Sequence, residues 1–392
     1  MTHLERFKAV VHFERPDYVP IFGLKGAGFA HGAFTATHRR LVETGMPSTV
    51  GGIFEIGKPM KDSESWQRYW GTTTPIFLEL FPADPPRGIE TETRIEGEYE
   101  IVTSESGAVT RQMIDNPGMY GMPEFLVYDV RDRQSWEFYR DRMTPGPLWP
   151  DEKIEAECRI YKGRDRPLAL AVGGTWGSMR NLMGPEMACT VLYDDPGLAR
   201  DIIEWFLWNW KTYFFPLIER LRPEIVWTNE DICYKSGMLI SPAHFMELCG
   251  DAYRDLTALT RNCGIDLVFT DTDGKAMEYV PLLHELGVNG CFPFEVKAGN
   301  DLFELRRRFP RFIFMGWLEK EVMNAGNQGL IEREILSKVP ALLPSGGYFP
   351  TVDHSIQPLI TFENMCRFMT LLHEVTGNPE GEFPHIPAVP ED

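Results

Sequence analysis

The 392-residue sequence lacks several features, and each absence narrows its class. Its seven cysteines are odd in number and widely spaced, and none forms a Cys-x-x-Cys pair. This argues against a disulfide framework or a thiolate zinc finger, so we expect reduced thiols. The N-terminal segment MTHLERFKAVVHFERPDYVP lacks the apolar core of a signal peptide, and no apolar run is long enough to cross a bilayer. We therefore expect a soluble cytoplasmic protein.

Basic residues are also scarce. Lys and Arg number 39 against 57 Asp and Glu, which leaves a formal net charge of −18. The one dense basic run, Arg306–Arg308, falls within a predicted helix and is most simply a solvated face. Binding to phosphate backbones or anionic lipids needs basic clusters, so we expect neither a nucleic acid partner nor a membrane partner.

A glycine-rich phosphate-binding fingerprint is missing as well. The segment GGTWG at residues 173–177 comes closest, but its glycines lack the required spacing. Short apolar strands instead alternate with amphipathic helices after residue 165, in about six units, and the N-terminal strands would supply about two more. This alternation predicts an α/β protein with a parallel sheet. We favour a closed (β/α)8 TIM barrel over an open doubly wound sheet.

Two segments depart from this alternation. Residues 89–114 contain ETRIEGEYEIVTSESGAVTRQMI, in which polar and apolar residues alternate as in a half-buried strand. We predict a small antiparallel β insert there, a hairpin or meander outside the barrel. Residues 378–392 are rich in Pro and predict an extended tail. The expected organisation is a single domain spanning residues 1–392.

Acidic residues follow two consecutive predicted strands between Asp266 and Glu295. Asp271 and Asp273 end the first strand, and Glu295 follows the second. The C-terminal ends of parallel strands converge on one face of a barrel, so carboxylates at these ends share one mouth. Glu295 comes directly after Cys-Phe-Pro-Phe, and a carboxylate in such apolar surroundings needs a partner.

Two further residues have the same placement. Glu230 follows the predicted strand EIVWTN, and His354 follows GYFPTVD. Carboxylates and one His at a barrel mouth can bind a divalent metal, and they can equally serve as general acid and base. Each also has a structural reading, because Asp273 can cap the next helix and a lone His is more often structural than a ligand. Convergence of the whole set on one mouth is therefore the prediction.

Several blocks of sequence carry a resemblance to a known superfamily. They are RFKAVVHFERPDYVPIFG, NEDICYKSGMLISP, TDTDG, PFEVKAGNDL and GGYFPTVDHSIQPLITFENM. In this order they resemble the uroporphyrinogen decarboxylase superfamily, which also contains corrinoid-dependent methyltransferases, over nearly the whole chain. The resemblance implies a (β/α)8 barrel with its site at the C-terminal mouth.

The resemblance is closer to the methyltransferase branch than to the true decarboxylases. Where the decarboxylases carry two arginines for substrate carboxylates, this chain has FGLKGAGFAHG, which offers Lys25 and His31. The methyltransferases hold zinc with His-x-Cys after one strand and a later Cys. The matching places here are Asp271-Thr272-Asp273 and His354. Without thiolates, a site of carboxylates and one His suits zinc, but also manganese or iron.

The leading hypothesis from this resemblance is a metal-dependent methyltransferase. It would pass a methyl group from a small methylated substrate, such as a methoxy compound, to a corrinoid on a partner protein. A divalent metal, zinc first, would polarise the substrate oxygen. A homodimer is one assembly that the resemblance allows. The expected metal ligands are Asp273, Glu295 and His354, with Glu230 as a fourth; Asp271 or Tyr234 would handle the proton; Trp176 and Trp317 would wall the pocket, and Lys235 would hold a substrate anion.

Two alternatives remain open. A decarboxylase of a small carboxylic acid would hold the carboxylate with Lys25, Lys235 or Arg180 and protonate the product with an Asp. A non-enzymatic barrel would bind a small molecule without turnover. Metal content separates the first hypothesis from decarboxylation, and a stable complex with a corrinoid protein favours it over both.

Overall fold

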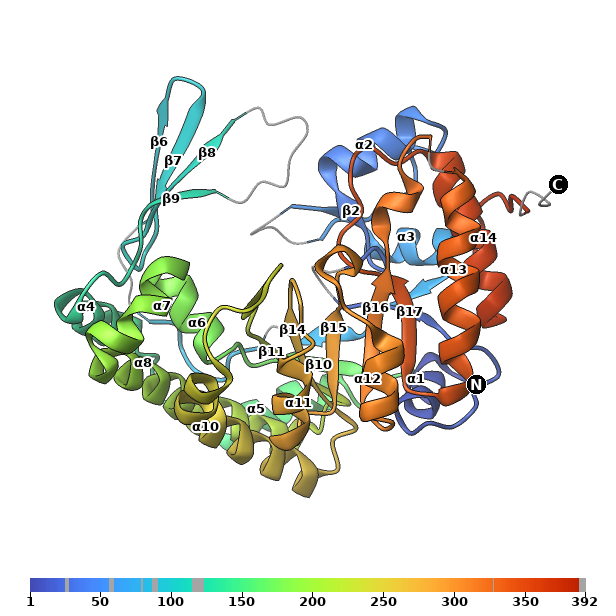
Figure 1. Ribbon diagram of the computed structural model, residues 1–392. Helices are drawn as coiled ribbons and strands as arrows, with labels where there is room; N and C mark the ends of the chain where they lie inside the picture. Colours follow the sequence, from blue (N-terminus) through green and yellow to red (C-terminus); the bar gives the residue numbers. More distant parts are fainter. Residues whose placement is uncertain are drawn as a thin grey trace.

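The computed structural model describes residues 1–24, 28–55, 60–78, 80–86, 91–114, 123–326 and 328–387. Its centre is a seven-stranded parallel sheet in the order β17-β16-β15-β14-β11-β10-β5, curled around an interior (Figure 1). The strands are β5 (Ile76–Leu78), β10 (Leu168–Ala171), β11 (Ile225–Asn229), β14 (Leu267–Thr272), β15 (Gly290–Pro293), β16 (Ile313–Leu318) and β17 (Tyr348–Val352). All seven are joined by parallel ladders, which confirms the predicted α/β class.

An eighth strand position comes from the N-terminus. Strand β1 (Ile21–Phe22) pairs in parallel with β4 (Thr72–Thr73), and β5 begins only a few residues after β4. Thr74 and Pro75 separate the two, and Pro has no N–H with which to continue a ladder. Strands β4 and β5 therefore act as one interrupted strand, which pairs with β1 through β4 and with β10 through β5. With β1 added in this way, the seven strands form a barrel-like ring.

The ring is not closed by hydrogen bonds, and here the predicted closed barrel is corrected. Among the described strands, no ladder joins β1 to β17. Aromatic packing joins them instead, because the ring centroids of Phe22 and Phe349 lie 5.1 Å apart. Phe7 of helix α1 (His3–Val11) packs on both, at 5.3 and 5.7 Å. Strands this short have few backbone groups to pair, so side chains form the seam.

The interior of the ring follows from side-chain alternation along the strands. A compact cluster contains residues from seven of the strands and from α1, all inside the ring. Its buried members are Phe7, Val10, Val11, Phe22, Leu24, Ala169, Ile225, Leu267, Phe269, Phe292, Ile313, Met315 and Phe349. The contribution of α1 closes the N-terminal end of the ring, so only the opposite end is left as a mouth.

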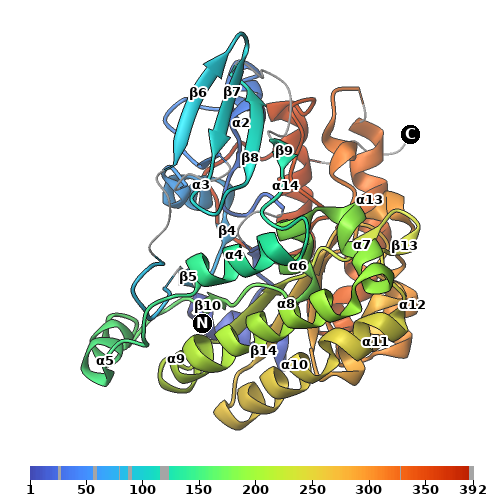
Figure 2. The same ribbon diagram turned by 90° about the vertical axis from the view of Figure 1, so that its left-hand side faces the viewer.

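Helices cover the outside of the sheet and bury the alternate side chains in a second, larger cluster. Helices α8 and α10 run side by side there (Figure 2). A π-helical turn, Trp210–Phe214, joins α8 to α9, whose second residue is Pro216. The outer helices are α5 (Asp151–Ile160), α6 (Trp176–Met183), α7 (Pro185–Asp194), α8 (Pro196–Asn209), α9 (Phe215–Leu221), α10 (Pro242–Cys263), α11 (Tyr279–Glu285), α12 (Leu302–Arg308), α13 (Gln328–Leu342) and α14 (Phe362–Thr376).

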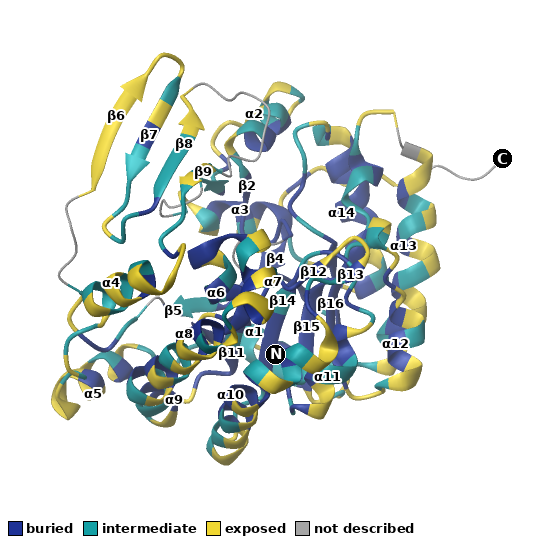
Figure 3. Cartoon of the chain, turned by 60° about the vertical axis from the view of Figure 1, so that its left-hand side comes forward, coloured by how far each residue is buried: buried dark blue, intermediate teal, exposed yellow. Residues whose placement is uncertain are grey.

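The predicted antiparallel insert is present and larger than expected. Strands β6 (Glu92–Glu96), β7 (Tyr99–Thr103), β8 (Val109–Met113) and β9 (Glu124–Val127) form a four-stranded antiparallel sheet that stands apart from the ring (Figure 1). Its edge strand β6 is exposed along its whole length (Figure 3). Between β1 and β4 in sequence lie the short pair β2 (Ala33–Phe34) and β3 (Ile53–Phe54) and the helices α2 (Thr35–Glu43) and α3 (Ser63–Trp70). Helix α4 (Arg133–Met143) follows the insert and precedes α5.

The cysteines and the helices were each the subject of an expectation from the sequence. All seven cysteines are free thiols. In the described part of the chain, no helix combines the length and apolar character that a membrane crossing requires.

The aromatic seam generates a stability prediction. Phe22→Ala should lower the free energy of unfolding by about 3–5 kcal/mol, because Phe22 is fully buried and touches both Phe7 and Phe349. Urea titration followed by circular dichroism measures this loss. The control Phe138→Ala, whose side chain is 52 % exposed on α4, should change it by less than about 1 kcal/mol. Equal losses in the two variants would contradict a seam held by packing.

Candidate active site at the C-terminal mouth

The mouth contains a carboxyl group held by its neighbouring strand. Asn229 ends β11 and lies opposite Asp271 of β14 in the parallel ladder. Both follow the inward-facing Trp227 and Phe269 by two residues, so their side chains also face the interior. The Asn229 amide nitrogen lies 2.8 and 2.7 Å from the two carboxyl oxygens of Asp271. Asp271 is neither fully buried nor exposed, so it meets solvent at the mouth.

This environment favours the protonated form of Asp271. Burial raises the pKa of Asp271 well above its usual range, and the Asn229 hydrogen bonds only partly oppose the shift. The nearby carboxylates of Asp231, Asp273 and Glu230 raise it further. Asp271 can therefore hold a proton at a pH where an ordinary Asp is ionised, which is the property of a general acid.

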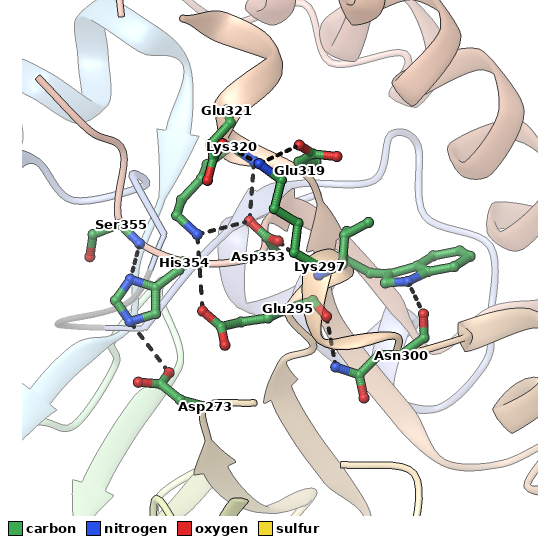
Figure 4. A network of polar contacts seen from close by, with 12 residues as sticks. Asp273, Glu295, Lys297, Asn300, Glu319, Lys320, Glu321, Asp353, His354 and Ser355 are labelled. Carbon is green, nitrogen blue, oxygen red and sulfur yellow. Dashed lines mark hydrogen bonds and ion pairs between the residues drawn. The ribbon is translucent and has the colours of Figure 1, made fainter. Parts of the chain in front are cut away.

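A second pair of side chains joins two strand ends across the mouth. His354, after β17, lies with Nε2 3.3 Å from Oδ1 of Asp273, after β14 (Figure 4). Its Nδ1 accepts a hydrogen bond of 2.8 Å from the backbone N–H of Ser355. In the neutral ring the proton therefore lies on Nε2 and is donated to Asp273. The predicted approach of these two residues is found.

Burial and pairing shift the pKa values of Asp273 and His354 in opposite directions. Burial raises the pKa of Asp273, but the His354 hydrogen bond and the charges of His354, Lys320 and Arg180 outweigh it, so the pKa is lowered. Burial likewise lowers the pKa of His354, and the hydrogen bond and charge of Asp273 outweigh it, so the pKa is raised. The pairing thus favours an ionised Asp273, whereas on His354 its effect is opposed by the Ser355 N–H, which faces Nδ1 where the second ring proton would lie.

Glu295 belongs to a neighbouring part of the same network. Its Oε2 accepts the backbone N–H of Gly274 at 2.8 Å, and its Oε1 lies 4.0 Å from Nζ of Lys320. The same ammonium lies 3.7 Å from Asp353, whose side chain is buried. Asp353 also accepts the backbone N–H groups of Val296 and Lys320 (Figure 4). Lys320 therefore supplies positive charge where the sequence predicts a metal ion.

Glu230 lies away from this network, because alternation along β11 turns it outward while Asn229 faces in. It is fully buried at the start of α6 and accepts hydrogen bonds from Thr175, Gly177 and Tyr253. Burial raises its pKa, and these four hydrogen bonds, with N···O and O···O distances of 2.6–2.8 Å, oppose the rise. Its geometry is that of a helix cap rather than of a metal ligand.

The residues expected to wall the pocket or bind substrate lie elsewhere. Trp176 is fully buried in α6 within the outer cluster. Trp317 has a φ of 67° and packs in the outer cluster, and its indole donates to the carbonyl of Asn300. Tyr234, 67 % exposed, and the exposed Lys235 occupy the small hairpin of β12 (Cys233–Tyr234) and β13 (Gly237–Met238).

Of the cations proposed for a substrate carboxylate, Arg180 already has a partner. It pairs with Asp231 at 2.6 Å, at the edge of the mouth. Lys25 lies outside the described residues.

The geometry does not fit the predicted metal centre. Within the described ranges, no group of three or more His, Cys, Asp or Glu side chains is placed to hold a metal ion. Asp273 faces His354, whereas both oxygens of Glu295 face N–H donors, so the expected trio does not converge on one point. A metal ion would have to displace these donors.

Sequence reasoning missed two residues of the mouth. Asn229 was visible as the last residue of a predicted strand, and the two-residue period that faces Asp271 inward also faces Asn229 inward. No sequence pattern indicates the role of Lys320. It lies in the turn Lys320–Met323 after β16, and the path of this turn brings its ammonium group to Asp353 and Glu295.

Comparison with known proteins gives a likeness of fold. No family model matches the chain, and no curated protein sequence matches it. Among solved structures, it is similar to a methyltransferase from Methanosarcina mazei, with a TM-score of 0.55 and 12 % identity. The likeness covers 96 % of this chain and 98 % of the other. At this identity it shows a shared fold over nearly the full length of both proteins.

The Asp273–His354 pair predicts a pH-dependent stability difference. The raised pKa of His354 gives stability that is present below about pH 6.5 and lost as pH rises through the raised value. The lowered pKa of Asp273 gives stability above about pH 3.9 that is lost as pH falls through the lowered value. The difference in unfolding free energy between wild type and His354→Asn should therefore shrink between pH 6 and pH 9.

Urea titrations at each pH measure this difference. It should not exceed about 1 kcal/mol, because Asp273 is half exposed and the Ser355 amide opposes a second ring proton. In an Asp273→Asn background the pH dependence should disappear. If the pH dependence persisted in that background, a titratable group other than this pair would be its cause.

The cap formed by Glu230 gives a separate prediction. Glu230→Gln replaces an acceptor oxygen by an NH2 group that faces backbone N–H donors of α6, so the free energy of unfolding should fall by about 2–3 kcal/mol. Differential scanning calorimetry of this variant and of the exposed control Glu247→Gln checks the effect. A free energy of unfolding equal to that of wild type would contradict the capping role of Glu230.

Proposed function

We propose that this protein is a methyltransferase whose reaction takes place at the C-terminal mouth. It would take a methyl group from a small methylated substrate and pass it to a corrinoid carried by a separate protein. The observation that carries the proposal is Asp271, a carboxyl group favoured in its protonated form, held by Asn229 at a solvent-accessible position inside the ring. The fold likeness to a methyltransferase over nearly the full chain agrees with it.

The proposed step needs a proton at the leaving oxygen. The bond between the methyl carbon and the substrate oxygen breaks, and the oxygen keeps the electron pair. Asp271 donates its proton to that oxygen, so the substrate leaves as a neutral alcohol or phenol. The acceptor supplies the electron pair of the new bond to the methyl carbon. Asn229 holds the carboxyl group in place before and after proton transfer, because its amide donates in either state.

Protonation replaces the Lewis acid that the sequence predicts. A metal ion and a carboxylic acid both stabilise negative charge on a leaving oxygen. Because the described side chains do not fit a metal centre, we derive no step through a metal. The paired charges of Asp273, His354, Glu295 and Lys320 instead form a polar rim near Asp271, which raises the pKa of Asp271 through the Asp273 carboxylate.

Substitution of Asp271 tests the proposal. Asp271→Asn keeps the shape of the side chain and removes its proton, so methyl transfer should slow by about 10²–10⁴-fold. A panel of methoxy compounds is incubated with free cob(I)alamin, and formation of methylcobalamin is followed by absorbance. The control Asp251→Asn, on the outer face of α10 and 92 % exposed, should retain wild-type rates.

The two opposing results are separable. A wild-type rate in Asp271→Asn would remove Asp271 as the acid. Release of CO2 from small carboxylic acids, with no methyl transfer from any methoxy compound, would support decarboxylation in its place.

A further inference from the structure

The antiparallel insert has an uncovered edge at β6. This strand is the outermost of four, and no described strand pairs with its other side. All five of its residues are exposed, and it lies on the side of the insert that faces away from the ring (Figure 1, Figure 3). An uncovered edge strand presents unpaired N–H and C=O groups, with which another strand can pair.

The other edge of the same sheet, β9, is protected against such pairing. Pro123 comes directly before it, and a register shift leaves Leu126 out of its ladder with β8. A Pro and a bulge both keep an edge strand from pairing. Strand β6 has neither feature, because its five residues include no Pro and pair with β7 in one unbroken register.

The hairpin that joins β6 to β7 sets the direction of the backbone groups of β6. Gly97, with a φ of 62°, and Glu98 form a two-residue turn, and Glu96 lies opposite Tyr99. A turn of this length is closed by a hydrogen-bonded pair, so the N–H and C=O of Glu96 point toward β7. These groups alternate along a strand, so those of Ile95 point to the open edge.

The hydrogen bonds on the other side of β7 give the same direction. The C=O of Glu98 accepts from the N–H of Ile114 at 2.9 Å, and the N–H of Ser104 donates to the C=O of Ala108 at 2.8 Å. Even-numbered residues of this stretch therefore face β8. The odd-numbered residues face β6, where they lie opposite even-numbered positions. Ile95 is odd-numbered, so its N–H and C=O are directed away from β7.

The side chains of β6 suit pairing with an identical strand. Glu92, Arg94 and Glu96 share one face and alternate in sign, and Ile95 on the other face is 60 % exposed. In an antiparallel pair with its twofold axis at Ile95, each Arg94 lies opposite the partner's Glu96, and the two Ile95 side chains meet. An axis at Arg94 would instead place like charges opposite each other. Opposite charges directly across two strands stabilise the pair, and like charges destabilise it.

We propose that β6 binds the β6 strand of a second copy of this chain, so that the two four-stranded inserts form one continuous antiparallel sheet. The two Ile95 residues exchange N–H···O=C hydrogen bonds at the axis, and each Arg94 pairs with the partner's Glu96. One pair of edge strands buries little surface, so the dimer is weak and dissociates on dilution. This inference is independent of the proposed methyltransferase function.

Sedimentation velocity of the full chain at increasing concentration tests the proposal. Wild type should approach twice the mass of one chain. Arg94→Glu places two carboxylates opposite each other at two points of the dimer, so the dissociation constant should rise about tenfold or more. Glu96→Arg should have the same effect through two guanidinium groups. The control Arg140→Glu, whose side chain on α4 is exposed to a similar extent, should associate as wild type does.

A mixture of the two variants separates charge pairing from a damaged fold. In a mixed dimer of Arg94→Glu with Glu96→Arg, each carboxylate again faces a guanidinium group. The mixture should therefore associate about as tightly as wild type, although neither variant does so alone. A wild type that stays monomeric at all concentrations, a dimer that is indifferent to both substitutions, or a mixture that fails to associate would overturn the proposal.

Discussion

The register between β11 and β14 is the constraint on which the candidate site depends. It sets Asn229 opposite Asp271, and side-chain alternation then turns both inward and turns Glu230 outward. A one-residue shift of β11 would turn Glu230 toward the mouth and Asn229 outward. Asp271 would then lose its amide partner. One hydrogen-bonded ladder therefore decides both that Glu230 caps α6 and that Asp271 meets Asn229.

The charges around the mouth are balanced in neighbouring pairs. His354 faces Asp273, Arg180 faces Asp231, and Lys320 lies between Glu295 and Asp353. Asp271 has an amide as its hydrogen-bond partner instead of a cation, and it is the carboxyl group whose pKa rises well above its usual range. A strongly acidic chain can therefore keep one proton donor in its mouth, because the cations are already paired with other carboxylates.

The α/β class, the antiparallel insert and the strand ends could be predicted from the sequence, because each depends on local periodicity and on polar residues at strand termini. The approach of Asp273 to His354 followed from the same logic. The same logic fails for Glu230. Side chains alternate along β11, so the residue after the inward-facing Asn229 points outward. Trp317 departs further, because a left-handed backbone conformation rotates its side chain out of the alternating pattern. The contacts of Lys320 depend on a turn whose path has no sequence signature.

The aromatic seam between β1 and β17 bears on how the ring assembles. Strands β10 to β17 can be added in chain order, each beside one of its sequence neighbours, whereas β1 must meet the last strand across nearly the whole chain. Joining such distant segments carries a loop-closure entropy cost, and contacts of this range slow folding. Packing of Phe22 on Phe349 and Phe7 offsets this cost without demanding one alignment of backbone groups. The last join of the ring can thus form late without disturbing the strand register already established at the mouth.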